Sequence, residues 1–101
     1  MKKPRVIKIG CHKYKVRYCK EVYIKNEAGN KEELLGYCDI DNFTILIKSG
    51  ICESMLKEVL IHECIHAIDQ VYGLGLSEKA VNMLGIEVVK LIMGNKLDLL
   101  K

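Results

Sequence analysis

The stretch "VLIHECIHAID", Val59 to Asp69, decides how the second half of this 101-residue chain folds. It lies inside a longer segment, Glu53 to Tyr72, in which apolar residues recur with the period of an α-helix. The residues of this apolar stripe are Leu56, Leu60, Cys64, Ile68 and Val71. We therefore predict one long amphipathic helix, with two histidines, His62 and His66, on its polar side.

The two histidines and the glutamate between them form a pattern with chemical meaning. Each residue of an α-helix advances by about 100°, so His62 and His66 lie about 40° apart on one face. Zinc accepts neutral imidazole nitrogens at about 2.0–2.1 Å in tetrahedral geometry. Glu63 lies about 100° from His62, where it can take a proton from a zinc-activated water. The pattern His-Glu-x-x-His thus predicts two zinc ligands and a general base.

A catalytic zinc usually has three protein ligands, so a third ligand is needed. The candidates on the next predicted helix are Glu78 and Glu87, and His12 is a distant third. Asp69 lies about 20° from His62 on the same helix face, where a third ligand would be crowded. We expect Asp69 to orient a histidine ring through its second nitrogen instead. These considerations leave both glutamates open.

Glycines and a serine divide the helical half into two helices. Gly73 and Gly75 are expected to end the first helix, because glycine adopts positive φ without strain. Ser77 is a suitable N-cap for a second helix, which Gly94 and Asn95 end. The residues of this helix that we expect to face the core are Val81, Leu84, Val88, Leu91 and Ile92.

The first half of the chain reads as short strands. Alternation over Tyr14–Cys19 places Tyr14, Val16 and Tyr18 on one face, and "RVIKI" before it forms a second strand. The polar run from Lys20 to Glu33 predicts a loop. The segments "LLGYCDI" and "FTILIK" predict a hairpin around the turn "DIDN". Strands followed by helices indicate an α+β fold, a short antiparallel sheet followed by two helices, in a single domain of residues 1–101.

Composition excludes several classes of protein. Apolar residues make up 50% of the chain and charged residues 29%, which is typical of globular proteins rather than disordered ones. The five cysteines are odd in number and form no Cys-x-x-Cys pair, so we expect reduced thiols that fill core space rather than bind zinc. No signal peptide or membrane span is expected, and the predicted location is cytoplasmic.

The motifs together resemble those of small zincin metallopeptidases, the gluzincin-like proteins of phages and mobile elements. The resemblance is carried by "LIHECIHAID", "YGLGLSE" and "SEKAVNMLG", and is strongest from Gly36 through Asn95. It implies a zinc-dependent peptidase, with Zn²⁺ bound by His62, His66 and a glutamate. It also implies that Glu63 is the catalytic base.

The resemblance also bears on the third ligand. In related peptidases the ligand glutamate is often followed four residues later by Asn or Asp, which supports the first histidine. Asn82 follows Glu78 at that spacing, whereas Leu91 follows Glu87, so the resemblance favours Glu78, with Asn82 as outer-shell support. A tight antiparallel pair of helices would instead bring Glu87 nearer to His66. Glu78 reaches the metal only if the first helix ends early or the second crosses it steeply.

Two further expectations come from the same resemblance. In zincins the edge strand of the sheet pairs with the extended substrate, and here that strand would be Phe43–Lys48. A group that stabilises the oxyanion is also expected. Its candidates are Tyr72, Tyr37, Tyr14 and His12, and nothing in the sequence separates them.

Other functions compete with the peptidase. A zinc-bound but inactive interaction module would explain the short chain, although such a module has no need of Glu63. The stretch "HKYKVRYCK" alternates Lys13, Lys15 and Arg17 with tyrosines, which would suit nucleic acid, but such a run is more often a solvated face. The expected partner is therefore a peptide or protein substrate, with a homo-oligomer or protein partner allowed. Nucleic acid is the less favoured alternative, and no membrane is expected.

Overall fold

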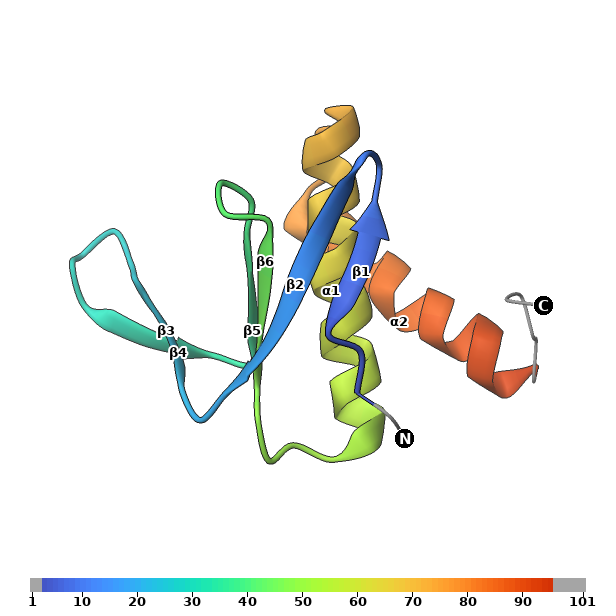
Figure 1. Cartoon of the computed structure of the whole chain (residues 1–101), viewed down its shortest axis with the longest axis horizontal. Coiled ribbons are helices and arrows are strands. Elements are labelled where there is room, and N and C mark those ends of the chain that lie inside the picture. Colours follow the sequence, from blue (N-terminus) through green and yellow to red (C-terminus); the bar gives the residue numbers. More distant parts are fainter. Residues whose placement is uncertain (1–2, 96–101) are drawn as a thin grey trace.

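The computed structural model describes residues 3–95, which form six strands followed by two helices (Figure 1). The strands are β1 (Val6–Ile9), β2 (His12–Cys19), β3 (Val22–Lys25), β4 (Lys31–Leu34), β5 (Gly36–Asp39) and β6 (Thr44–Lys48); the helices are α1 (Glu53–Tyr72) and α2 (Glu78–Gly94). The predicted α+β class is confirmed. The two ends of the predicted domain, residues 1–2 and 96–101, lie outside the described residues.

Four strands form the main sheet, in the order β1-β2-β6-β5. The predicted hairpin is confirmed, because β5 pairs with β6 in antiparallel fashion, and β1 pairs with β2 in the same way. The expectation of a wholly antiparallel sheet is wrong, since β2 and β6 run parallel with Val16 opposite Ile45. Parallel neighbours need a long crossover, which the residues between β2 and β6 supply. Pairing between strands so far apart in sequence leaves no mark in local patterns.

The predicted loop over Lys20–Glu33 is wrong, because this segment contains a separate antiparallel hairpin, β3–β4. Its turn is closed by two backbone hydrogen bonds of 2.9 Å, one from Asn26 to the carbonyl of Asn30 and one from Gly29 to that of Asn26. Figure 1 shows this hairpin reaching out from the main sheet. Its strands have four residues each, too few for the alternation to stand out among polar neighbours.

The core lies between one face of the main sheet and α1. Tyr14 and Val16 of β2 are buried there, as their alternation predicts, and Tyr18 is half-buried with its hydroxyl donating to the carbonyl of Pro4 at 2.6 Å. The other buried members of the core are Ile9, Cys38, Ile45, Ile47, Leu56 and Ala67. Burial of these side chains is the main force that holds α1 against the sheet.

Helix α1 has the predicted bounds, but its buried side differs from the predicted stripe. Ile68 is 38% exposed, whereas Glu63 and Ala67 are buried. Residues four apart drift by about 40° around a helix, so the steps from Leu56 to Ile68 accumulate about 120°. The predicted stripe therefore leaves the buried side before it reaches Ile68.

Helix α2 begins as predicted, with the Ser77 hydroxyl accepting a hydrogen bond from the Ala80 N–H at 3.1 Å. It packs mainly on α1, and only Val81 and Gly85 are buried. The placement of Leu84 and Leu91 in the core is wrong, since they are 45% and 54% exposed. A helix with one narrow contact can bury only a narrow strip. Neither helix of the described residues is long and apolar enough to cross a membrane.

Candidate metal centre

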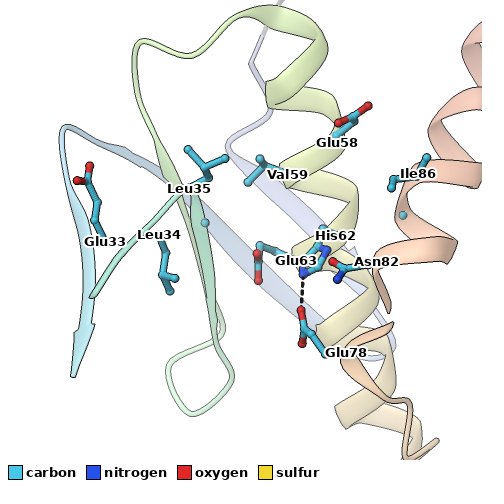
Figure 2. A pocket seen from close by; sticks show the side chains of 12 residues that line it. Glu33, Leu34, Leu35, Glu58, Val59, His62, Glu63, Glu78, Asn82 and Ile86 are labelled. Carbon is cyan, nitrogen blue, oxygen red and sulfur yellow. Dashed lines mark ion pairs between the residues drawn. The ribbon is translucent and has the colours of Figure 1, made fainter. Parts of the chain in front are cut away.

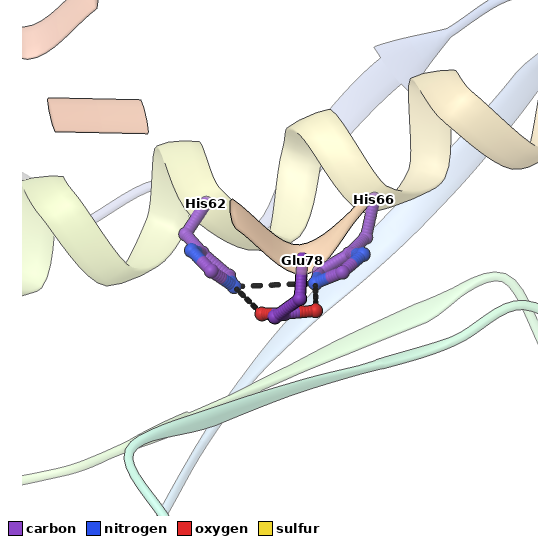
Figure 3. A group of neighbouring side chains, drawn as sticks. All are labelled: His62, His66 and Glu78. Carbon is purple, nitrogen blue, oxygen red and sulfur yellow. Dashed lines mark hydrogen bonds and ion pairs between the residues drawn. The ribbon is translucent and has the colours of Figure 1, made fainter. Parts of the chain in front are cut away.

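Three side chains of the predicted set converge on one point (Figure 3). The Nε2 atoms of His62 and His66 lie 3.2 Å apart. One carboxylate oxygen of Glu78 lies 3.1 Å from His62 Nε2, and the other lies 3.3 Å from His66 Nε2. The histidines come from adjacent turns of α1, and the glutamate is the first residue of α2.

These separations fit a tetrahedral zinc ion. Ligand atoms about 2.0–2.1 Å from zinc at tetrahedral angles lie about 3.3 Å from one another. The two imidazole nitrogens are 3.2 Å apart, and they lie 3.1 and 3.3 Å from the two different carboxylate oxygens of Glu78. Two imidazoles and one carboxylate also match the donor set of catalytic zinc sites with three protein ligands. The residues present could therefore hold zinc with little rearrangement.

Glu78 reaches the histidines because the chain turns back sharply after α1. Gly73 adopts left-handed backbone geometry, φ 59°, and its N–H bonds to the carbonyl of Asp69. The N–H of Leu74 bonds to the same carbonyl at 3.1 Å. The loop then returns along the last turns of α1 (Figure 1), so that Glu78 at the start of α2 lies beside His66. Helix α1 does not end early; it is the returning loop and the crossing of α2 that place Glu78.

Asp69 is buried, but it does not act as expected from the sequence. Its carboxylate accepts a hydrogen bond from the backbone N–H of Leu76 at 3.1 Å, and among the described residues it bonds to no histidine ring. The expectation that Asp69 bonds to an imidazole and orients it is therefore wrong, since its observed partner is the backbone of Leu76. Asp69 holds the returning loop two residues before Glu78, and so it positions the third member of the cluster.

Asn82 and Gly85 lie where α2 passes His62. Asn82 is exposed and lines the same hollow as His62, as Figure 2 shows. It makes no side-chain hydrogen bond within the described part of the chain, so its supporting role stays a prediction. Gly85 was not singled out from the sequence, yet a methyl group there would lie 3.6 Å from the Cα of His62. A small residue at this position allows the backbones to approach closely.

Glu63 lies on the sheet-facing side of the same helix turn, only 7% exposed. Burial, with a smaller contribution from the charge of Glu78, raises the pKa of Glu63 from 4.5 to about 7. No side-chain hydrogen bond to the Glu63 carboxylate occurs within residues 3–95. Glu63 borders the hollows beside His62, His66 and Glu78, which we call the triad. A carboxylate with a pKa near neutrality and no partner can both take up and return a proton.

Gly36 is a second residue that the sequence did not single out for the site. It begins β5 and lies against Glu63, and a methyl group at this position would meet Val59 Cγ1 at 2.6 Å and Glu63 Oε2 at 3.2 Å. Only glycine therefore allows β5 to lie so close to α1. A glycine directly before a short strand is the one sequence signal that could have pointed to this contact.

The surroundings of His62 favour its neutral form. Burial, and then the neighbouring His66, lower the pKa of His62, while the Glu78 carboxylate opposes them. Zinc binds the neutral form of imidazole, so a lowered pKa leaves His62 ready to bind at neutral pH. The side chains of His62 and His66 are 23% and 29% exposed, so an ion can reach them from solvent.

Two hollows flank the three side chains. One, of about 420 Å³, is lined by residues including Leu35, Val59, His62 and Ile86 (Figure 2). The other, of about 300 Å³, is lined by residues including Tyr37, Ile40, His66 and Gln70. Glu63 and Glu78 line both. The triad thus lies between two open spaces rather than at the bottom of one.

The other residues considered as metal ligands lie outside the group formed by His62, His66 and Glu78. Glu87 is 3.7 Å from Lys90 on the exposed side of α2, and His12 stacks on Phe43 with ring centroids 4.3 Å apart. Burial raises the pKa of Cys38 to about 12 and that of Cys64 to about 11, with the charge of Glu63 as the next cause. All five cysteines are free thiols, and none is part of the group formed by His62, His66 and Glu78.

The expectation that Phe43–Lys48 is the edge strand that pairs with a substrate is wrong. Strand β6, which contains most of Phe43–Lys48, is paired on both sides, with β2 and with β5. It is an interior strand and cannot pair with a substrate. Its apolar run marks burial rather than an edge. The edge strand next to the triad is β5, which lies at the end of the sheet.

No family model matches the chain, and no solved structure gives a significant match to it. Arguments about function therefore start from the arrangement of His62, His66, Glu78 and Glu63.

Proposed function

We propose that this chain is a zinc-dependent peptidase that hydrolyses peptide bonds with a metal-activated water. One observation carries the proposal: His62, His66 and Glu78 converge at zinc-compatible distances beside a buried, unpartnered Glu63. A purely structural zinc site is closed by four protein ligands, whereas three ligands leave a position open. The hollows on both sides would admit a substrate to that position.

The residues divide into distinct roles. His62, His66 and Glu78 would hold Zn²⁺, which when bound lowers the pKa of water and polarises a carbonyl group. Glu63 takes the proton of the attacking water and delivers it to the departing amine, and its raised pKa suits both transfers. Asp69 keeps Glu78 in place through the loop, and Asn82 supports His62 from α2. Burial of Glu63 among apolar side chains strengthens its effect on nearby charge.

The substrate is an extended peptide that pairs with the free edge of β5. Main-chain hydrogen bonds to a strand edge hold a peptide without regard to its sequence. The peptide would run past the triad, with its side chains in the two flanking hollows. Of the four candidates for oxyanion stabilisation, only Tyr37 lines either hollow, whereas Tyr14 is fully buried in the core. The Tyr37 side chain nevertheless points away from α1, because its neighbours Gly36 and Cys38 face Glu63 and the core, so we assign this role to none of the four.

The proposal includes a cytoplasmic setting of the phage or mobile-element type. Its support is the free state of all five cysteines and the resemblance of the motifs. The unpaired thiols would not survive as such in an oxidising compartment.

The test is peptide hydrolysis by the zinc-loaded chain. A mixture of unstructured peptides is incubated with the zinc-loaded protein, the same protein after chelation, and the chelated protein resupplied with zinc, and products are identified by mass spectrometry. The proposal predicts cleavage that disappears on chelation and returns with zinc. Absence of any product from a protein shown to contain zinc would contradict it.

A second candidate is a zinc-bound interaction module, favoured by the apolar side chains that α2 exposes. The large apolar side chains exposed there are Met83, Leu84, Ile86, Leu91 and Met93. Such a surface is typical of a protein contact, either with another protein or with a second copy of this chain. If the chain is such a module, the zinc-loaded protein should cleave no peptide, and Glu63→Gln should leave its behaviour in the hydrolysis experiment unchanged. The hydrolysis experiment therefore separates the two candidates.

A further inference from the structure

The charges of this chain are divided very unevenly along the sequence. The first 20 residues contain eight of the 16 Lys and Arg residues and none of the 13 Asp and Glu residues. The rest of the chain holds the other eight cations against all 13 acids. A mildly basic net charge of +3 therefore conceals a strongly basic segment joined to an acidic remainder.

The sheet sorts these cations onto one face. Successive side chains of a strand point to opposite faces, and Tyr14 and Val16 of β2 face α1. The residues between and beside them, Lys13, Lys15 and Arg17, are exposed on the other face. Lys8 of β1 joins them, because it lies directly opposite Lys13. We call these four residues the basic face.

The basic face is not neutralised by the protein itself. None of its four cations forms an ion pair within residues 3–95, whereas Lys48 pairs with Glu33 and Lys57 with Glu53. Among the strands of the main sheet, Asp39 is the only acid on this side, and Glu33 of β4 reaches the same side but pairs with Lys48. Asp39 lies two strands away from Lys15, about 9–10 Å, and its carboxylate accepts from Asn42. Like charges directly opposite each other in a sheet, such as Lys8 and Lys13, are destabilising.

The basic face is also uncovered by the described helices. Helix α1 packs on the core side of the sheet, and α2 packs mainly on α1. Figure 1 shows β1 and β2 crossing in front of α1, with their outer side clear of both helices. The face therefore lies on the other side of the sheet from the proposed zinc site. A large partner can occupy it without closing the hollows around His62 and His66.

We propose that the basic face binds the phosphate backbone of nucleic acid. The three cations of β2 form a row with a spacing of about 6.7 Å, the distance between alternate residues of a strand. A row of this kind fits a linear polyanion better than a single small anion. Lysine and arginine contacts to phosphate carry affinity without sequence preference, so binding is non-specific and weakens with salt. This inference does not depend on the proposed peptidase activity.

The test is the salt dependence of binding to a DNA duplex of about 20 base pairs, measured by fluorescence anisotropy. If all four cations contact phosphates, the slope of log Kobs against log salt is about −3.6. The variant Lys8→Gln/Lys13→Gln should weaken binding and make the slope shallower by about 1.8. Arg17→Gln should make it shallower by about 0.9. Neither change removes a core side chain, so both proteins should fold.

The chain offers a matched control in Lys25→Gln/Lys31→Gln. These lysines are also a directly opposed pair, on β3 and β4, so this variant makes the same change in net charge within the same kind of hairpin. It should keep the wild-type affinity and slope. An equal loss in the two double variants would mean that only net charge matters, and the proposal would be wrong. No binding by the wild type at about 50 mM salt, or tighter binding to phosphatidylserine vesicles than to the duplex, would also overturn it.

Discussion

Helix α1 and the first residue of α2 each bring a glutamate to the same hollow, in opposite surroundings. Glu63 of α1 faces the sheet, is 7% exposed and has no hydrogen-bond partner among the described residues. The Glu78 side chain is 64% exposed and contacts two imidazoles at 3.1 and 3.3 Å. Burial raises the pKa of Glu63 to about 7. The proposed function gives these two identical side chains different work, a base in the case of Glu63 and a metal ligand in the case of Glu78.

The difference follows from how each residue is held. Glu63 is fixed by the long helix and by the approach of β5 at Gly36. Glu78 is fixed only by the loop that Asp69 ties to the end of α1. Variants that change Glu63 or its surroundings, and others that change Glu78 or its loop, can test whether the two glutamates have different roles.

The largest effect is expected at Glu63. Glu63→Gln keeps the volume of the side chain but cannot accept a proton from water. Peptide hydrolysis should fall by about 10²- to 10⁴-fold, the usual contribution of a general base, while zinc content stays that of the wild type. Rates and zinc content are measured on the same preparation. Loss of zinc along with activity would mean that Glu63 is a metal ligand, and the proposed difference between Glu63 and Glu78 would not hold.

Glu78→Gln should have the reverse signature. It replaces an anionic oxygen ligand with a neutral amide. Loss of a residue that only supports a ligand lowers metal affinity by about 10- to 100-fold, and the loss of zinc affinity here should be larger. Glu87→Gln is the matched control, because Glu87 lies on the same helix and pairs only with Lys90. Zinc affinities of the two variants are compared by competition with a chelator. Loss of metal in Glu87→Gln but not in Glu78→Gln would contradict the arrangement in Figure 3.

Asp69→Ala tests the loop that carries Glu78. The variant leaves the partly buried N–H of Leu76 without its acceptor, which costs about 0.5–1.5 kcal/mol of folding free energy. Because the loop also positions Glu78, zinc affinity should fall as well, by about 10- to 100-fold. Chemical denaturation of the zinc-free protein gives the first quantity and metal competition the second. A stability loss with unchanged zinc affinity would show that Glu78 holds its place without the loop.

A further effect is a pH dependence of the zinc-free protein. The pKa of Glu63 is about 7 in the folded state and 4.5 as the reference value, so folding favours its protonated form. This stabilisation is fully present below pH 4.5 and is lost as the pH rises to 7. One such group contributes at most about 1.4 kcal/mol per pH unit. His62, whose pKa is lowered, acts in the opposite direction, so the measured quantity is the difference between wild type and Glu63→Gln.

In that comparison the wild type should lose stability relative to Glu63→Gln as the pH rises from 4.5 to 7. A difference that does not change over this range would mean that the carboxylate is not desolvated in solution.

Local patterns in the sequence were sufficient for the helices and much of the candidate site. The bounds of α1, the cap at Ser77, and the β5–β6 hairpin of the main sheet follow from helical period, capping chemistry and strand alternation. The meeting of His62 with His66 is also local, because residues four apart share a helix face. These features depend on neighbours along the chain, which is why the sequence contains them.

Features that depend on distant segments were not predictable in this way. The parallel pairing of β2 with β6 places β6 inside the sheet and leaves β5 at the edge, and no local pattern distinguishes these arrangements. The contact of Asp69 with Leu76 required the path of the returning loop. Gly36 and Gly85 matter because another element passes close to them. Exposure of Leu84 and Leu91 likewise reflects the narrow contact of α2 with α1.

The most direct test of the account is the zinc content of the wild type beside that of His62→Ala/His66→Ala. Both proteins are purified without chelators, equilibrated with zinc, passed through a desalting column and analysed for metal. The account predicts about one zinc ion per wild-type chain and none in the double variant, with a lower melting temperature for the variant because a ligand stabilises the state that binds it. A wild type that retains no zinc, or a double variant that retains as much, would contradict it.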